Sequence, residues 1–86
     1  MKISDQMRAL LQTLQPQQID IIDDSALHAG HAGAREGGHY RLAIVSAQFA
    51  GKKTMERHRM VHAALASLML NGIHALSITA KTPEEN

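Results

Sequence analysis

The chain has no cysteine and no tryptophan, and Tyr40 and Phe49 are its two aromatic residues. Without thiols it cannot by itself form a disulfide, a thiolate metal site or a thiol nucleophile. The sequence also lacks an apolar run long enough to cross a bilayer, and its start does not resemble a signal peptide. We therefore expect a cytoplasmic protein that has no membrane partner.

The length of 86 residues is sufficient for one hydrophobic core and too short for two. We expect a single domain over residues 1–86, with an aliphatic core because aromatic residues are so scarce. The sequence contains no Walker loop and no GxGxxG motif, and no Ser-His-Asp arrangement can be named from its spacing. These absences favour a non-enzymatic protein that works by binding partners.

Two segments have the apolar spacing of amphipathic helices. The first has an apolar stripe at positions 3, 7, 10, 11 and 14, with Ser4 as the expected N-cap and Pro16 ending the helix. The second is expected to begin with Thr54 as its N-cap and to run to about Leu70. Asn71 and Gly72 should end it.

Three segments have the pattern of strands: residues 18–24, 40–45 and 73–80. The first two should pair antiparallel around the glycine-rich segment 25–38. The last two are separated by a helical crossover long enough to make them parallel. We therefore predict an α+β fold of order α-β-β-α-β, with a mixed three-stranded sheet and helices on one face. In the last strand, His74, Leu76 and Ile78 are expected to share a face.

Six histidines are unusual in so short a chain. His28 and His31 lie in the glycine-rich segment, and His39 lies just past it. An exposed loop can carry an imidazole to an external ligand, and imidazole binds zinc, copper, iron and nickel. The alternative is that these side chains simply face water. His74, at the start of an apolar strand, is either a hydrogen-bonded structural histidine or a ligand that the strand holds rigidly.

A second histidine pair, His58 and His62, is spaced four residues apart on the second predicted helix. Zinc-binding pairs have this spacing, but no glutamate lies between the two and no third ligand is evident. We favour a structural role for this pair.

A basic segment overlaps the same helix, although the formal net charge of the whole chain is only +1. Cations near a helix N-terminus oppose its dipole, so they can serve a purpose other than stability. The segment is either a solvated charged rim or a surface for phosphate or an acidic partner. Its basic residues are Lys52, Lys53, Arg57 and Arg59.

Taken together, several short motifs make the chain resemble the BolA family over nearly its whole length. The two most specific are Arg57-His58-Arg59-Met60-Val61 and Ile73-His74-Ala75-Leu76. Supporting segments are His39-Tyr40-Arg41-Leu42, Phe49-Ala50-Gly51 and Thr82-Pro83-Glu84.

The resemblance implies an αββααβ fold similar to a class II KH domain, with the helical crossover divided into two helices. It also implies association with a monothiol glutaredoxin and with iron–sulfur trafficking. The ligands would be His74 and a residue of the loop between the first two strands, with His31 as first choice and His28 as second. A [2Fe–2S] cluster normally takes four ligands, mostly thiolates, so the thiolates would come from a glutaredoxin cysteine and glutathione.

The alternative function is that of a DNA-binding transcriptional regulator, because BolA-like proteins are also linked to transcriptional control. In this case Lys52, Lys53, Arg57 and Arg59 would contact DNA phosphates. The sequence has no Gly-x-x-Gly loop at the helix junction. A KH-style nucleic-acid surface is therefore disfavoured.

Overall fold

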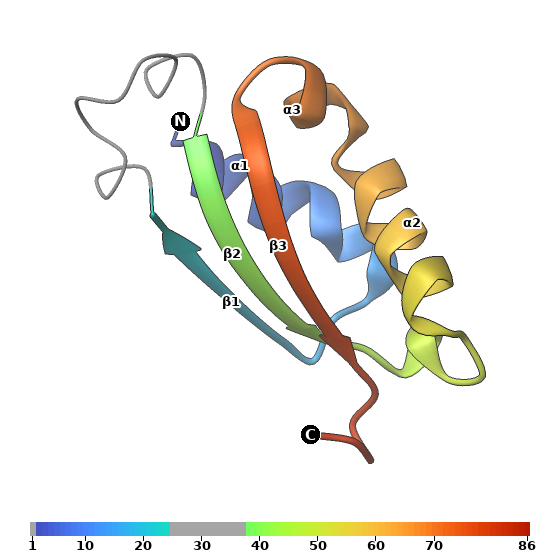
Figure 1. Ribbon diagram of the computed structural model, residues 1–86. Coiled ribbons are helices and arrows are strands. Elements are labelled where there is room, and N and C mark those ends of the chain that lie inside the picture. The colour runs from blue at the N-terminus through green and yellow to red at the C-terminus, as the bar shows by residue number, and fades with distance from the viewer. Residues whose placement is uncertain (1, 25–37) are drawn as a thin grey trace.

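The computed structural model describes residues 2–24 and 38–86. The segment carrying His28 and His31 lies outside this range. The described elements, in chain order, are α1 (Ile3–Leu11), η1 (Gln12–Leu14), β1 (Gln18–Asp23), β2 (Gly38–Val45), η3 (Ala47–Phe49), α2 (Thr54–Ala64), α3 (Ala66–Leu70) and β3 (Ile73–Lys81), where η1 and η3 are 3-10 helices (Figure 1). This is the predicted α+β architecture.

The three strands form one sheet in the order β1-β2-β3. Strand β1 is antiparallel to β2, with Ile21 opposite Leu42, and β3 is parallel to β2, with Leu42 opposite Ile78. Both predicted pairings are confirmed. Because β2 and β3 run in the same direction, their N-terminal ends lie side by side at one end of the sheet (Figure 1).

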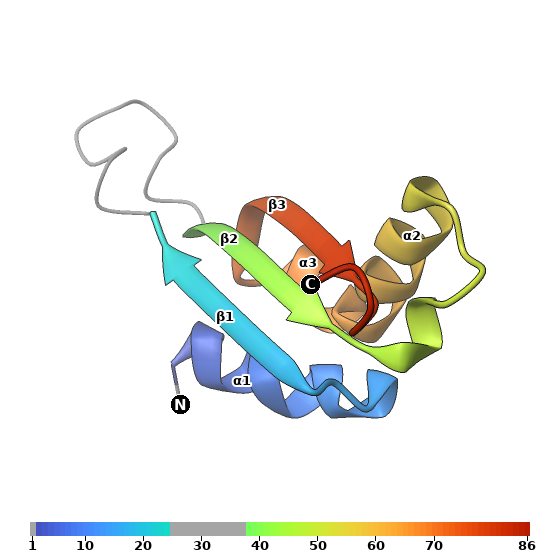
Figure 2. The same ribbon diagram turned by 90° about the horizontal axis from the view of Figure 1, so that it is seen from below.

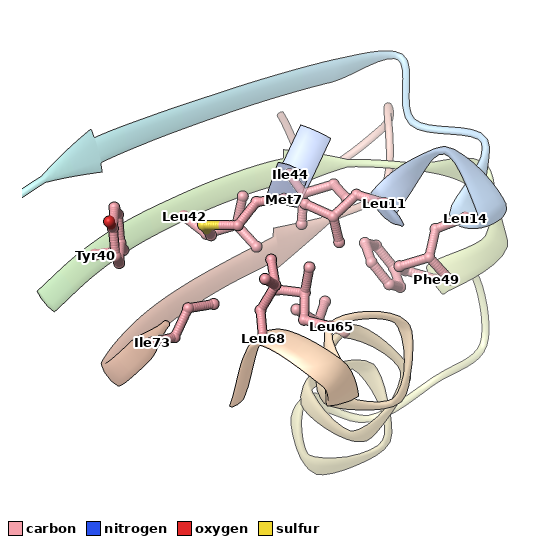
Figure 3. Packing of buried hydrophobic residues seen from close by; sticks show 11 residues of the cluster. Met7, Leu11, Leu14, Tyr40, Leu42, Ile44, Phe49, Leu65, Leu68 and Ile73 are labelled. Atoms are coloured by element: carbon pink, nitrogen blue, oxygen red, sulfur yellow. The ribbon is translucent and has the colours of Figure 1, made fainter. Parts of the chain in front are cut away.

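The core lies between one face of the sheet and the helices. Along β2, Tyr40, Leu42 and Ile44 are buried, whereas the intervening Arg41 and Ala43 are exposed on the opposite face. Figure 3 shows the buried side chains of β2 meeting those of α1 and α3, and α1 runs along one side of the sheet in Figure 2. The helices therefore cover one face, as the period-2 pattern of the strand requires.

The helix ends differ in detail from those expected. Helix α1 begins at Ile3 with Lys2 in the N-cap position, so the prediction of Ser4 as the cap is wrong. Helix α2 begins at Thr54 with Lys53 in the N-cap position, so the prediction of Thr54 as the cap is also wrong. The Glu56 carboxylate accepts a hydrogen bond from the Lys53 backbone N–H at 3.3 Å.

The predicted long helix is divided at Leu65, whose φ of −100° and ψ of 13° interrupt the helical backbone. Leu65 and Leu68 are both buried in the core. No helix within the described ranges is long and apolar enough to cross a bilayer.

Candidate functional site

His74 lies where the register of the pairing between β2 and β3 shifts. Gly38 is opposite Ile73 and His39 is opposite Ala75, so His74 is an additional residue on β3. Such β-bulges re-aim side chains and are over-represented near functional sites, yet they are rare between parallel strands. The bulge therefore marks the start of β3 as a candidate functional position.

The bulge also changes the face on which His74 lies. Ile73 and Leu76 both lie on the helix-covered face, Ile73 as a buried core residue and Leu76 packed against the core. The two residues between them, His74 and Ala75, are exposed on the outer face. The expectation that His74 shares a face with Leu76 and Ile78 is wrong, because the additional residue shifts the alternation by one.

His39 is the neighbour of His74 on the adjacent strand. The two ring centroids are 5.2 Å apart and the ring planes are inclined by 46°. His39 is half-buried and His74 is exposed. Sequence reasoning noted His39 but did not assign it to the site. The signal that could have identified it is the predicted parallel pairing, which places the starts of two histidine-bearing strands side by side.

A shallow open depression of about 340 Å³ lies beside His39 on the outer face of the sheet. At its rim the Asp24 carboxylate forms an ion pair with Arg41, with Nε and Oδ2 2.6 Å apart, and the Asp24 backbone N–H donates to the His39 carbonyl at 2.7 Å. The Asp24 carboxylate is therefore already engaged in an ion pair. The residues that line the depression are Asp24, His39, Tyr40, Arg41, Ala75, Leu76 and Ser77.

The other histidines do not join this pair in the described part of the chain. His58 is half-buried and His62 is exposed, both on α2. Over residues 2–24 and 38–86 no group of three or more histidine or carboxylate side chains could hold a metal ion. His31 and His28 lie outside the described residues, so their assignment as the loop ligand stays a prediction.

Arg57, one of the four predicted phosphate contacts, is bound within the chain. Its side chain is 13% exposed. Its Nη1 donates to Glu85 Oε1 at 2.6 Å and to the Ala80 carbonyl at 3.1 Å, while Nε donates to the Lys52 carbonyl at 2.9 Å. This guanidinium therefore joins the start of α2 to the end of β3 and the segment that follows β3.

The same cluster lowers the pKa of Glu85 to about 2, first because Arg57 donates hydrogen bonds to its carboxylate and then because the Thr82 backbone N–H donates to it. Conversely, the pKa of Arg57 is raised, chiefly by its hydrogen bonds to Glu85. Both groups are thus charged at neutral pH, and the Arg57 side chain contributes to structure rather than to a free basic surface.

The remaining basic residues, Lys52, Lys53 and Arg59, are exposed at and near the start of α2. Since Arg57 bonds to Ala80, this basic surface lies near the C-terminal end of β3. His74 lies at the other end of that strand, and the stretch from His74 to Ala80 spans about 20 Å at about 3.3 Å per residue (Figure 1). The structure therefore separates the two candidate sites.

Comparison with known proteins identifies the family. The family model described as BolA-like protein matches residues 10–85. BolA-like protein 1 of Mus musculus is 41% identical over 76 residues, which cover 88% of this chain and 54% of that protein, so the chain spans about half of that relative's length.

A relative from Vibrio cholerae, the DNA-binding transcriptional regulator BolA, is 35% identical over 78 residues, covering 91% of this chain and 72% of that protein. The solved structure of the BolA domain of SufE1 from Arabidopsis thaliana is similar over 100% of this chain and 98% of that chain, with 40% identity and a TM-score of 0.86. The chain therefore belongs to the BolA family.

Proposed function

We propose that the chain is a non-enzymatic adaptor that binds a monothiol glutaredoxin in the cytoplasm and shares a [2Fe–2S] cluster with it. His74 is the anchored ligand in this proposal. The observation that carries it is the bulge at the start of β3, which places His74 on the exposed outer face of the sheet at a backbone position held by strand pairing.

The donor set of the described residues fits a shared cluster. A [2Fe–2S] cluster takes four ligands, and over residues 2–24 and 38–86 no group of three or more histidine or carboxylate side chains could hold a metal. Thiolates must then come from outside the chain, which contains no cysteine. A glutaredoxin cysteine and glutathione would supply them, so the cluster would form only at the interface between the two proteins.

The role of this chain's residues is to bind and orient. A ligand on a paired strand is held more rigidly than one on a loop, so His74 fixes one coordination position. The second position belongs to His31 in this proposal, with His28 as the alternative. When bound, the cluster supplies electron-transfer capacity, and histidine ligation raises its reduction potential relative to all-thiolate ligation.

The test is a titration of the chain with a cluster-bearing monothiol glutaredoxin, followed by visible absorption and circular dichroism. We expect the wild-type chain to change both spectra and His74→Ala to abolish the change. His62→Ala is the matched control, because it removes an exposed imidazole from α2 and should behave as wild type. An unchanged spectrum with the wild-type chain would refute the proposal.

The choice between the loop histidines is tested in the same assay. His31→Ala should alter the spectrum of the complex, whereas His28→Ala should leave it close to that of the wild type. The opposite result would transfer the second ligand position to His28.

A second candidate function is DNA binding, which is supported by two observations. Lys52, Lys53 and Arg59 form an exposed basic surface, and a relative from Vibrio cholerae carries the name of a DNA-binding transcriptional regulator. We propose that these three side chains contact phosphates, with Arg57 orienting the start of α2 through its bonds to Glu85 and Ala80.

Salt dependence tests this second function. Each phosphate contact contributes about 0.9 to the slope of log affinity against log salt concentration. Removal of Lys52, Lys53 and Arg59 together should therefore lower the slope by about 2.7. Lys2→Ala, which removes one exposed charge at the start of α1, should leave the slope unchanged. A flat salt dependence, or no binding at about 50 mM salt, would exclude DNA binding.

A further inference from the structure

Strand β3 has an outer edge that pairs with no other strand of the described residues, because the sheet order is β1-β2-β3 (Figure 1). Two hydrogen bonds show which backbone groups face this edge. The Ser46 backbone N–H donates to the Lys81 carbonyl at 2.9 Å, so Lys81 faces β2. The preceding carbonyl, that of Ala80, faces outward, where it accepts a hydrogen bond from Arg57 Nη1 at 3.1 Å.

The outer edge of β3 is limited at both ends and open between them. The bulge at His74 interrupts the strand at one end, and Arg57 occupies the Ala80 carbonyl at the other. Between these limits lie residues 75–79, which we call the open edge. Successive residues of a strand direct their backbone groups to alternate edges, so Leu76 and Ile78 face outward together with Ala80.

The open edge lacks the features that usually keep an edge strand unpaired. Such strands commonly carry a charged residue or a proline, which prevents another strand from adding to the sheet. Residues 75–79 are Ala-Leu-Ser-Ile-Thr and contain neither. The backbone N–H and C=O groups of Leu76 and Ile78 are therefore suited to pairing with a further strand.

We propose that the open edge binds the open edge of a second copy of this chain. The two β3 strands run antiparallel, with Ser77 on the two-fold axis, and join the two three-stranded sheets into one. This inference does not depend on the proposed function, because it requires neither a glutaredoxin nor a cluster.

The second copy is the occupant because the open edge is complementary to itself. With Ser77 on the axis, Leu76 of each copy lies opposite Ile78 of the other. Each such pair exchanges both of its backbone hydrogen bonds, so every outward group of the open edge is satisfied. An alignment centred on Ile78 would instead require the Ala80 carbonyl, which Arg57 already binds.

The side chains agree with the same alignment. Leu76 and Ile78 lie on the helix-covered face and are half-buried, so each apolar side chain meets another one across the joint. On the outer face, exposed Ser77 meets its own copy and exposed Thr79 meets Ala75. No charged residue of the open edge is brought beside a like charge.

The outer edge of β1 is not suited to the same pairing. Its Ile19 carbonyl accepts a hydrogen bond from Arg8 Nη1 at 3.1 Å. The strand also carries two carboxylates, those of Asp20 and Asp23. Two copies joined along β1 would bring these carboxylates together, and like charges across a strand pair are destabilising. Pairing between copies is therefore expected at β3.

The experiment is sedimentation of the purified chain, without glutaredoxin, at concentrations from about 10 µM to about 1 mM. We expect a monomer–dimer equilibrium with a dissociation constant on the order of 100 µM, because the joint is smaller than a standard interface. In amide NMR spectra the signals of Leu76 and Ile78 should shift with concentration. The signal of Ile21 on β1 should not.

A matched pair of variants tests the alignment. In the dimer the two Ser77 residues lie directly opposite, with Cα atoms about 4.5 Å apart. Ser77→Asp and Ser77→Lys should therefore each weaken the dimer by about 5- to 100-fold through like-charge repulsion. Thr79→Asp is the control, because its two carboxylates would lie about 13 Å apart along the strands, beyond the screening length of about 8–10 Å. It should dimerise as wild type does.

A mixture of the two charged variants separates repulsion from misfolding. Opposite charges directly across a strand pair are favourable, so the Ser77→Asp chain mixed with the Ser77→Lys chain should form a heterodimer at least as tight as the wild-type dimer. A wild-type chain that stays monomeric up to about 1 mM would overturn the proposal. So would equal dimerisation of Ser77→Asp and Thr79→Asp. Neither result bears on cluster sharing with a glutaredoxin, which is tested separately.

Discussion

Replacing Ser46 by alanine should destabilise the fold more than its small size suggests. Ser46 is fully buried at the junction of three segments. Its Oγ donates a hydrogen bond to the Leu14 carbonyl at 2.6 Å and accepts one from the Gln48 backbone N–H at 3.1 Å, while its own backbone N–H donates to the Lys81 carbonyl at 2.9 Å. The hydroxyl thereby joins the end of η1 to the end of β2 and caps η3.

The expected loss follows from these contacts. Ser46→Ala keeps the backbone bond to Lys81 and removes both side-chain bonds. One neutral hydrogen bond contributes about 1 kcal/mol, and leaving a buried partner unsatisfied costs about 1–3 kcal/mol. Loss of an N-cap side chain typically costs about 1 kcal/mol. These contributions overlap, so we expect a decrease of about 2 kcal/mol in the free energy of unfolding.

Urea denaturation followed by far-UV circular dichroism measures this change. Ser67→Ala is the matched control because Ser67 is exposed on α3, and its free energy of unfolding should stay within about 0.5 kcal/mol of wild type. For a domain of this size, about 2 kcal/mol corresponds to a decrease in Tm on the order of 10 °C. If Ser46→Ala and Ser67→Ala were equally stable, the assigned role of the buried hydroxyl would be wrong.

Two further predictions concern the segments next to the sites. The pKa of Glu85 is lowered from 4.5 to about 2, so its contribution to stability is fully present above about pH 4.5 and is lost as the pH falls toward 2. Urea denaturation across this range should show a smaller pH dependence for Glu85→Gln than for wild type, and identical profiles would contradict the assignment. Gly72 has a φ of +139°, a backbone conformation that residues with a side chain rarely adopt, so Gly72→Ala should cost about 1–3 kcal/mol. The control is Gly51→Ala, because its φ of +76° lies closer to the left-handed region that other residues can adopt, with nothing within 4 Å of the new Cβ; the same denaturation assay should show a smaller loss, and a larger one would refute the argument from backbone conformation.

The periodicity of apolar residues was sufficient to predict the elements and their order. Alternation along β2 identified which residues face the helices, and the length of the crossover predicted that β2 and β3 are parallel. These inferences succeeded because each depends on local spacing or on a general rule of chain connection.

Features that depend on contacts between distant segments could not be predicted in this way. The bulge at His74 is a property of the register between β2 and β3, which no local pattern specifies. The bonds between Arg57 and Glu85 join residues 28 positions apart. Sequence reasoning therefore grouped Arg57 with the free basic residues and did not assign His39 to the site.

The most direct test of cluster sharing is pulsed electron paramagnetic resonance of the reduced complex, prepared from a ¹⁵N-histidine-labelled chain and an unlabelled monothiol glutaredoxin. Any strong ¹⁵N coupling must then come from an imidazole of this chain. We predict a strong coupling that disappears in His74→Ala and persists in His62→Ala. A wild-type complex without strong ¹⁵N coupling would contradict ligation by His74.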